Sequence, residues 1–195
     1  MQTELPGVIT WETVAAHLSE RTKLVSVASN HFLSGYRPDI DRIGRELRAR
    51  DILFCVDGIQ TVGAFPTPLE HVDFMSADSH KWMLGPNLAG VLYVRRSVQT
   101  RLQPALLGSS NVHSPEYISQ EEMNLVDGAA RYEPGSPNLA GIAGMLAAVE
   151  LLLGFGRDNV SARILELRQT LLEALRPQGW QLMLEEWDTS SQASD

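Results

Sequence analysis

The sequence predicts an α/β fold whose sheet is mostly parallel and covered on both faces. Short apolar runs rich in β-branched and aromatic residues recur between residues 23 and 94, and turn-forming residues bound them. A segment with helical periodicity separates the first run from the second. Strands that alternate with helices and are apolar throughout are typical of parallel sheets with buried faces.

Four runs are predicted to be strands, at residues 23–28, 52–56, 73–77 and 90–94. Four segments are predicted to be helices, at residues 10–19, 38–50, 139–153 and 159–176. Thr10 is a candidate N-cap of the first helix, and Pro38 suits the first turn of the second. The helix at 139–153 is rich in Ala, Leu, Met and Gly, so we expect it to be buried. Apolar residues recur at helical spacing in the helices at 38–50 and 159–176: Ile40, Ile43, Leu47, Ile164, Leu167, Leu171 and Leu175.

Residues 96–137 lack periodicity and are expected to form loops around short helices, and the tail at 188–195 is expected to lack regular structure. We divide the chain at residue 155. Residues 1–155 are predicted to be one domain, and residues 156–195 are predicted to be a connecting helix with the start of a second, incomplete domain.

The composition excludes several classes of protein. It is 44% hydrophobic and 21% charged, which is typical of a globular chain, and the basic residues that contribute to the net charge of −8 are scattered. A nucleic-acid partner is therefore not expected. The apolar stretch at 144–153 is shorter than the ~20 residues of a membrane span, and no signal peptide is recognisable, so we expect a cytoplasmic protein without a membrane partner. The one cysteine, Cys55, excludes an internal disulfide and is expected to pack in the core.

Polar residues gather where the predicted strands end. Asn30 and His31 follow the first strand, Asp57 and Gln60 follow the second, and Asp78-Ser79-His80-Lys81 follows the third. Ligands of open α/β sheets bind beyond the carboxyl ends of the strands. Asp57 could simply end a strand in a turn, and a lone lysine is usually a solvated surface charge. The position of Lys81 after a buried strand and before Gly85-Pro86 favours a functional role.

The segment from Val25 to Ser97 resembles the class V aminotransferase group of fold-type-I enzymes that use pyridoxal 5'-phosphate (PLP). The resemblance is carried by Asp-x-x-Gln at 57–60 and His-Lys-Trp at 80–82, and the block Glu-Pro-Gly-Ser-Pro-Asn at 133–138 resembles a later motif of that group. The group includes cysteine desulfurases, kynureninase-like enzymes and isopenicillin N epimerase-like proteins. The resemblance implies the large domain of that fold, with three α/β/α layers, in an incomplete form.

The resemblance also implies residue roles. Lys81 would carry PLP as a Schiff base, and Asp57 would pair with the pyridine nitrogen and keep the ring cationic. Gln60 would contact the phenolic oxygen or the imine region of the cofactor, and His80 would contact the phosphate. Ser136 would reach the phosphate bound by a neighbouring subunit, since the family's sites lie at a homodimer interface. The substrate would be an amino acid, through transamination, elimination, desulfuration or epimerisation.

Three features depart from the family pattern. His31 stands where relatives often have Asn or Gln, and Asp78 stands where desulfurases have Ser or Thr for the phosphate, which favours another branch. Segments expected before and after this chain, including a substrate-binding arginine, are not found in it, so we expect part of a longer enzyme. The alternative is a non-catalytic remnant that acts as a structural or interaction module. A nicotinamide-binding domain is disfavoured because no Gly-x-Gly-x-x-Gly turn follows a predicted strand, and His17, His71 and His113 lack metal-ligand spacing.

Overall fold

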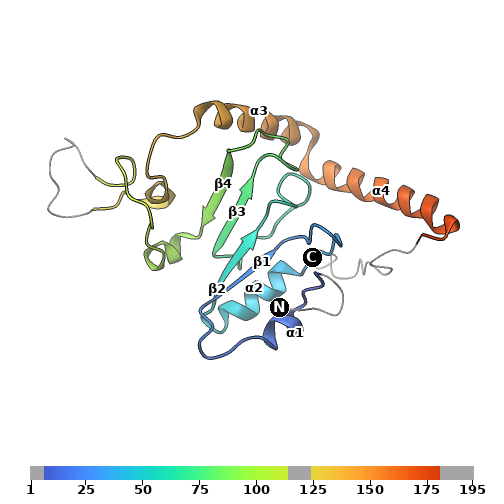
Figure 1. Ribbon diagram of the computed structural model, residues 1–195, viewed down its shortest axis with the longest axis horizontal. Helices are drawn as coiled ribbons and strands as arrows, with labels where there is room; N and C mark the ends of the chain where they lie inside the picture. Colours follow the sequence, from blue (N-terminus) through green and yellow to red (C-terminus); the bar gives the residue numbers. More distant parts are fainter. Residues whose placement is uncertain (1–6, 114–123, 181–195) are drawn as a thin grey trace.

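The computed structural model describes residues 7–113 and 124–180 of the 195-residue chain. Four strands and four α-helices follow one another in the order shown in Figure 1: α1 (Trp11–Ala15), β1 (Leu24–Ala28), α2 (Ile40–Arg48), β2 (Leu53–Asp57), β3 (Phe74–Asp78), β4 (Gly90–Val94), α3 (Leu139–Phe155) and α4 (Arg157–Leu175). Three 3-10 helices complete the described part: η1 (Arg96–Arg101), η2 (Gly128–Tyr132) and η3 (Arg176–Gln178). All predicted strands and helices are present, and the predicted tail at 188–195 lies outside the described residues.

The strands form one sheet in the order β1-β2-β3-β4. β1, β2 and β3 are parallel, and β4 is antiparallel to β3, which confirms the prediction of a mostly parallel sheet. Residues 79–89 join β3 to β4, and so short a connection favours an antiparallel neighbour. The ladder places Asp57 opposite Ser76 and Asp78 opposite Gly90.

One face of the sheet packs against α1 and α2. Helix α2 begins after Asp39, whose side-chain oxygen accepts the backbone N–H of Arg42 at 2.9 Å, so the helix starts two residues after Pro38. Its apolar face then meets the inward side chains of β1 and β2. The resulting core contains Val14, Val25, Val27, Ile40, Ile43, Leu47, Phe54, Val56 and Met75.

The other face of the sheet is largely open within the described residues. It carries Ser26, Asp57 and Ser76, and all three are exposed, as is half of the Leu92 side chain. Only a small cluster of Phe74, Val94 and Val98 covers one end of this face, with Tyr132 packed against it. Among the described residues, the prediction that both faces are covered therefore holds for one face only. The other face carries polar side chains at alternate positions of its strands.

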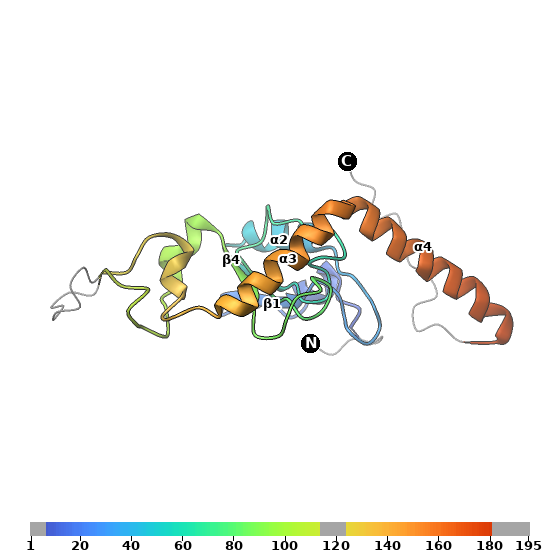
Figure 2. The ribbon, with the colours of Figure 1, turned by 90° about the horizontal axis from the view of Figure 1, so that it is seen from above.

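Helix α3 lies across the end of the sheet and packs on the segment that joins β3 to β4. Small residues allow this approach: a Cβ on Gly144 would lie 3.1 Å from the Pro86 ring, and one on Gly141 would lie 3.1 Å from Ala89. Figure 2 shows α3 above the strands and α4 turning outward. The two helices are bent by 79° at the break between them. The expectation that α3 is buried is wrong for the described residues, because only Gly141 is buried in it.

No single helix of the described residues is long and apolar enough to cross a membrane. Helices α3 and α4 would satisfy the length and composition criteria only when taken together as a bent pair.

Candidate functional site

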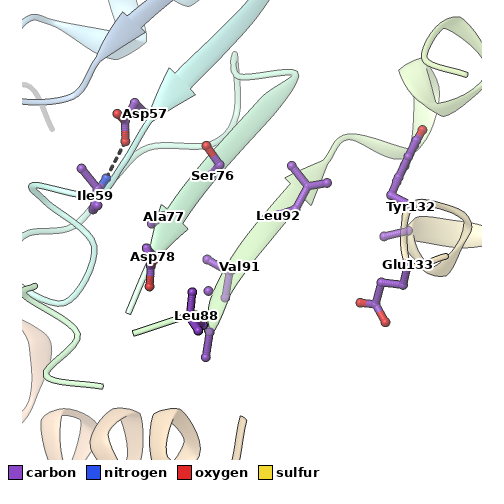
Figure 3. A pocket seen from close by; sticks show the side chains of 13 residues that line it. Asp57, Ile59, Ser76, Ala77, Asp78, Leu88, Val91, Leu92, Tyr132 and Glu133 are labelled. Atoms are coloured by element: carbon purple, nitrogen blue, oxygen red, sulfur yellow. Dashed lines mark hydrogen bonds between the residues drawn. The ribbon is translucent and has the colours of Figure 1, made fainter. Parts of the chain in front are cut away.

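A cavity of about 640 Å³ opens on the uncovered face of the sheet, at the ends of β2 and β3 and the start of β4. Figure 3 shows its walls, with Asp57 and Asp78 on one side and Tyr132 and Glu133 on the other. Ligand pockets for small molecules usually enclose ~300–1,000 Å³. The remaining lining residues are Ile59, Ser76, Ala77, Leu88, Ala89, Gly90, Val91, Leu92 and Ala129.

Asp57 is the last residue of β2 and presents its carboxylate at this cavity. One carboxylate oxygen, Oδ1, accepts the backbone N–H of Ile59 at 3.0 Å, as the dashed line in Figure 3 marks. This hydrogen bond is the turn-forming role that the sequence left open for an Asp-Gly dipeptide. It also fixes the carboxylate beside the apolar Ile59 side chain. A turn-forming role of Asp57 is therefore compatible with a role in ligand binding.

Lys81 lies in the turn after β3, three residues beyond the strand end, and its side chain is exposed. The turn is closed by Ser79, which is fully buried. The Ser79 hydroxyl donates to the Pro86 carbonyl at 2.5 Å, its N–H donates to Ala89 and its carbonyl accepts from Gly85, both at 2.8 Å. The same segment holds two leucines with positive φ, Leu84 at 58° and Leu88 at 65°. Such backbone is costly for a branched side chain and is retained where a structure over-determines it.

His80 and Asp78 form a pair beside this turn. The His80 Nδ1 atom lies 3.2 Å from the Asp78 Oδ1 atom, and both side chains are about one-third exposed. The nearby His80 imidazole lowers the pKa of Asp78 below its ordinary value. Asp78 therefore carries a negative charge at neutral pH, at the edge of the cavity.

The other predicted site residues lie apart from the cavity lining. His31 is partly buried, and its Nδ1 atom accepts the Ser34 N–H at 3.2 Å while its ring packs against Gly7. Gln60 is partly buried in the turn after β2. Ser136 is exposed between η2 and the start of α3. Among the predicted residues, only Asp57 lines the cavity, together with Asp78, for which the sequence suggested no positive role.

The far wall of the cavity was missed by the sequence analysis. The Tyr132 hydroxyl donates to the carbonyls of Gln99 and Leu102 at 3.1 and 3.2 Å, and burial raises the pKa of this phenol. Asn111, which is fully buried, donates to the carbonyls of Leu106 and Arg131 at 2.9 and 3.0 Å. The one sequence signal for this wall was the length of the loop at residues 96–137. Loops of that length are often functional, but the length does not indicate which residues take part.

A metal site is not present in the part of the chain that the structure describes, where no group of three or more His, Cys, Asp or Glu side chains could hold an ion. Cys55 is partly buried and packs against the cluster of Phe74, Val94 and Val98. The chemistry of the cavity is therefore that of carboxylates, a phenol and apolar walls, with an amine and an imidazole in the adjoining turn.

Comparisons with known proteins give one consistent result. The family model described as "Aminotransferase class-V" matches residues 1–189. A protein of Borreliella burgdorferi named "Probable cysteine desulfurase" is 30% identical over 172 residues, which are 86% of this chain and 39% of that protein. The apo structure of a cysteine desulfurase from Thermococcus onnurineus NA1 has a TM-score of 0.73 at 25% identity and matches 80% of this chain and 38% of its own.

A structure described as a C-DES mutant with glycine covalently linked to its PLP cofactor shares the fold, with a TM-score of 0.77 at 23% identity over 85% of this chain and 44% of its own. The chain thus spans about 40% of the length of the relatives that it matches. The resemblance stated from the sequence motifs and the fold type that it implied are both confirmed.

Proposed function

Because this chain belongs to the class V aminotransferase family, we propose that it forms the cofactor-binding part of a PLP-dependent enzyme that acts on an amino acid. The observation that carries the proposal is the position of two residues at one edge of the sheet. Asp57 ends β2, and the turn that bears Lys81 follows β3, the parallel neighbour of β2. Carboxyl ends of neighbouring parallel strands are the usual ligand site of such sheets.

Lys81 supplies the amine that attaches the cofactor, and the Ser79 hydrogen bonds hold the turn so that the lysine is presented from a fixed backbone. PLP, when bound to such a lysine, supplies a conjugated ring that accepts the electrons left on the substrate carbon. The Lys81 amine would also be the group that takes or returns the substrate's α-proton. Asp57 would hold the ring nitrogen in its protonated form.

The residues present fit the ring end of this cofactor. The cavity is large enough for a small aromatic ligand, the Asp57 carboxylate stands at its edge, and Ile59 gives an apolar surface next to it. Carboxylates from Asp78 and Glu133 also line the cavity, so a phosphate group is disfavoured there. We therefore place the phosphate outside this lining, at His80. Gln60 is proposed to contact the phenolic oxygen or the imine region of the cofactor, and His31 lies at the strand end from which a second such contact would come.

The reaction class follows from the relatives. Several are named as cysteine desulfurases, so cysteine is the first substrate to test, with C–S bond cleavage as the reaction. Asp78 stands where the desulfurases are expected to carry a hydroxyl residue, which favours transamination or elimination on another amino acid. Proposed further features are a cytoplasmic location and a homodimer in which Ser136 serves the neighbouring subunit's site.

The sequence offers a sharp test, because it contains only two lysines, Lys23 and Lys81. Purified protein is mixed with PLP, reduced with borohydride and digested, and mass spectrometry locates the pyridoxyl group. We expect the group on Lys81, loss of imine absorbance in Lys81→Ala, and unchanged absorbance in the matched control Lys23→Ala. Lys23 precedes β1, at the opposite edge of the sheet, so a nonspecific reaction of exposed amines would label both.

The non-catalytic alternative is favoured by one observation, namely that Lys81 does not line the cavity that contains Asp57. It predicts equal labelling of the two lysines at a low level. Turnover of an amino acid by protein that is labelled at Lys81 would exclude this alternative, whereas equal labelling would exclude the enzyme.

A further inference from the structure

A small apolar cavity, here called the junction pocket, lies where α3 meets α4. Its volume is about 160 Å³. The segment after β2, the turn that carries Lys81 and the two helices supply its walls, among them Val62, Phe65, Met83, Val149, Leu152 and Arg157. Figure 1 shows the helix junction beside the loop that follows β2. The junction pocket shares no lining residue with the cavity that contains Asp57, so it is a separate site.

The junction pocket is suited to a small apolar group. Aliphatic side chains, the Phe65 ring and the Met83 side chain, which is 4% exposed, form most of its surface. An apolar cavity of ~150 Å³ stays dry and accepts a ligand of the size of benzene, because water finds too few polar partners in it. A single aromatic ring or a branched aliphatic group therefore fits the volume.

Two arginines give the junction pocket a positive charge. Arg157 lines it and is exposed, and no carboxylate of the described residues forms an ion pair with Arg157. Arg37 lies over the Phe65 ring, with its guanidinium carbon 4.0 Å from the ring centre. One Arg37 nitrogen, Nη1, is buried and has no hydrogen-bond partner among the described residues.

The environment of Arg37 leaves its charge uncompensated. Burial lowers the pKa of Arg37, because loss of solvent disfavours the charged form. The Phe65 ring attracts the guanidinium but offers its N–H groups no oxygen acceptor. An anion next to Phe65 would offset this cost, since a partly buried charge is stabilised by an opposite charge with hydrogen-bond acceptors.

We propose that the junction pocket binds a small carboxylate that has an apolar body. The apolar body occupies the cavity, and the carboxylate pairs with Arg157 at its rim, while Arg37 adds positive charge next to the Phe65 wall. A planar guanidinium matches a carboxylate because it offers two parallel N–H donors. The proposal does not rest on the proposed function, because neither Lys81 nor Asp57 lines the junction pocket.

The test is a titration of the purified chain with benzoate, followed by the NMR signals of the methionine methyl groups. We expect benzoate to shift the signal of Met83, which lines the junction pocket, and to leave the signal of Met75, which belongs to the core under α2. Met83→Leu and Met75→Leu assign the two signals. For so small a ligand we expect a dissociation constant on the order of 1 mM. An unshifted Met83 signal at about tenfold higher benzoate would overturn the proposal.

Two further compounds separate the roles of charge and cavity. Benzamide has the ring without the charge, and acetate has the charge without the ring. Each should bind at least about threefold more weakly than benzoate, since each lacks one of the two contributions. Equal binding of benzamide would overturn the role of the arginines, and equal binding of acetate would overturn the role of the cavity.

Variants locate the site. Arg157→Gln and Arg37→Gln should each weaken benzoate by about threefold and leave benzamide unchanged. The matched control is Arg163→Gln on α4, because Arg163 pairs with Glu166 and does not line the junction pocket. Val160→Phe fills the junction pocket with a ring and should abolish binding, and circular dichroism verifies that each variant is folded. Unchanged benzoate binding in either arginine variant, equal weakening by Arg163→Gln, or full binding by folded Val160→Phe would overturn the assignment.

Discussion

The sheet half of the molecule, residues 7–101, and the helical arm, residues 139–180, are stabilised in different ways. Every buried apolar side chain among the described residues lies in the sheet half except Leu172. The arm exposes Leu146, Leu167 and Leu171 by more than half. The sheet half is thus held by its own core. The arm is held by local helix signals and by a few close contacts of α3 with the β3–β4 segment.

The difference has a functional counterpart. The residues proposed to attach and polarise the cofactor, Lys81 and Asp57, lie on the sheet half and its turn, where backbone positions are fixed by the ladder and by Ser79. The arm instead exposes apolar side chains, among them Leu139 and Leu146 of α3. Catalytic groups need rigid support, whereas binding surfaces need exposure.

The largest expected effect compares two apolar residues, one from each region. Phe54 is 1% exposed in the core of the sheet half, and Leu151 is 53% exposed on α3. Phe54→Ala should lower the free energy of unfolding by about 3–5 kcal/mol through lost burial and a cavity. Leu151→Ala should change it by less than about 0.5 kcal/mol. Urea titration measures both, and similar losses would show that the arm carries a core of its own.

A second comparison uses one ion pair from each region. Asp73 is 4% exposed, accepts the Phe54 N–H at 2.9 Å and pairs with Arg95, so it joins the ends of three strands. Asp73→Asn should destabilise the protein by about 2 kcal/mol, since charged hydrogen bonds are weakened and stay buried.

The matched change in the arm is Glu166→Gln, which breaks the pair with Arg163 at 2.7 Å, where both side chains are more than 60% exposed. Solvent screening limits this pair to about 0.5 kcal/mol or less. A loss of similar size in the two variants, measured by urea unfolding, would contradict the assignment of Asp73 as a buried tie between strands.

A third comparison should give opposite signs. Gly44 lies in α2, and a Cβ there would meet the His71 carbonyl oxygen at 2.6 Å, whereas a Cβ on Gly154 of α3 would meet nothing within 4 Å. Gly44→Ala should therefore cost about 1–2 kcal/mol by overpacking. Gly154→Ala should add up to about 1 kcal/mol by its higher helix propensity. Thermal unfolding distinguishes the signs, and a gain from Gly44→Ala would show that α2 can move away from His71.

The sequence predicted elements well where one short-range signal dominates. The spacing of Ile40, Ile43 and Leu47 predicted the buried face of α2, and all three are buried. The prediction that α3 is buried was wrong, because amino-acid composition indicates how apolar a helix is but not which other elements surround it. Leu139–Phe155 is almost wholly apolar, yet the described residues cover only the side that carries Gly141.

The candidate site was predictable only in part, for a similar reason. Asp57 follows a strand directly, so the ladder fixes its place, and it lines the cavity. Tyr132 and Glu133 reach the same cavity through a long loop whose path depends on Asn111, a contact between distant residues that no local pattern encodes. The roles of Lys81, Gln60, His80, His31 and Ser136 stay predictions.

The smallest expected effect concerns the pH dependence of stability. It tests whether polar contacts of α2, as well as its apolar face, help to hold this helix in the sheet half. Asp41 of α2 accepts a hydrogen bond from His71 at 2.8 Å and pairs with Arg45, and these partners, with His71 first, lower the pKa of Asp41. A lowered folded-state pKa means that the unfolded chain binds the proton more readily. The stabilisation is therefore complete above the ordinary aspartate value of about 3.9 and is lost as pH falls below it.

Asp41 is about one-third exposed, so screening keeps this contribution below about 1 kcal/mol. We expect the free energy of unfolding to fall less between pH 5 and pH 3 in Asp41→Asn than in the unchanged protein. His71→Gln should reduce the same pH dependence partially, because Arg45 remains as a partner of Asp41. If both variants kept the full pH dependence, the acid sensitivity would belong to other carboxylates, and the attachment of α2 would rest on its apolar face alone.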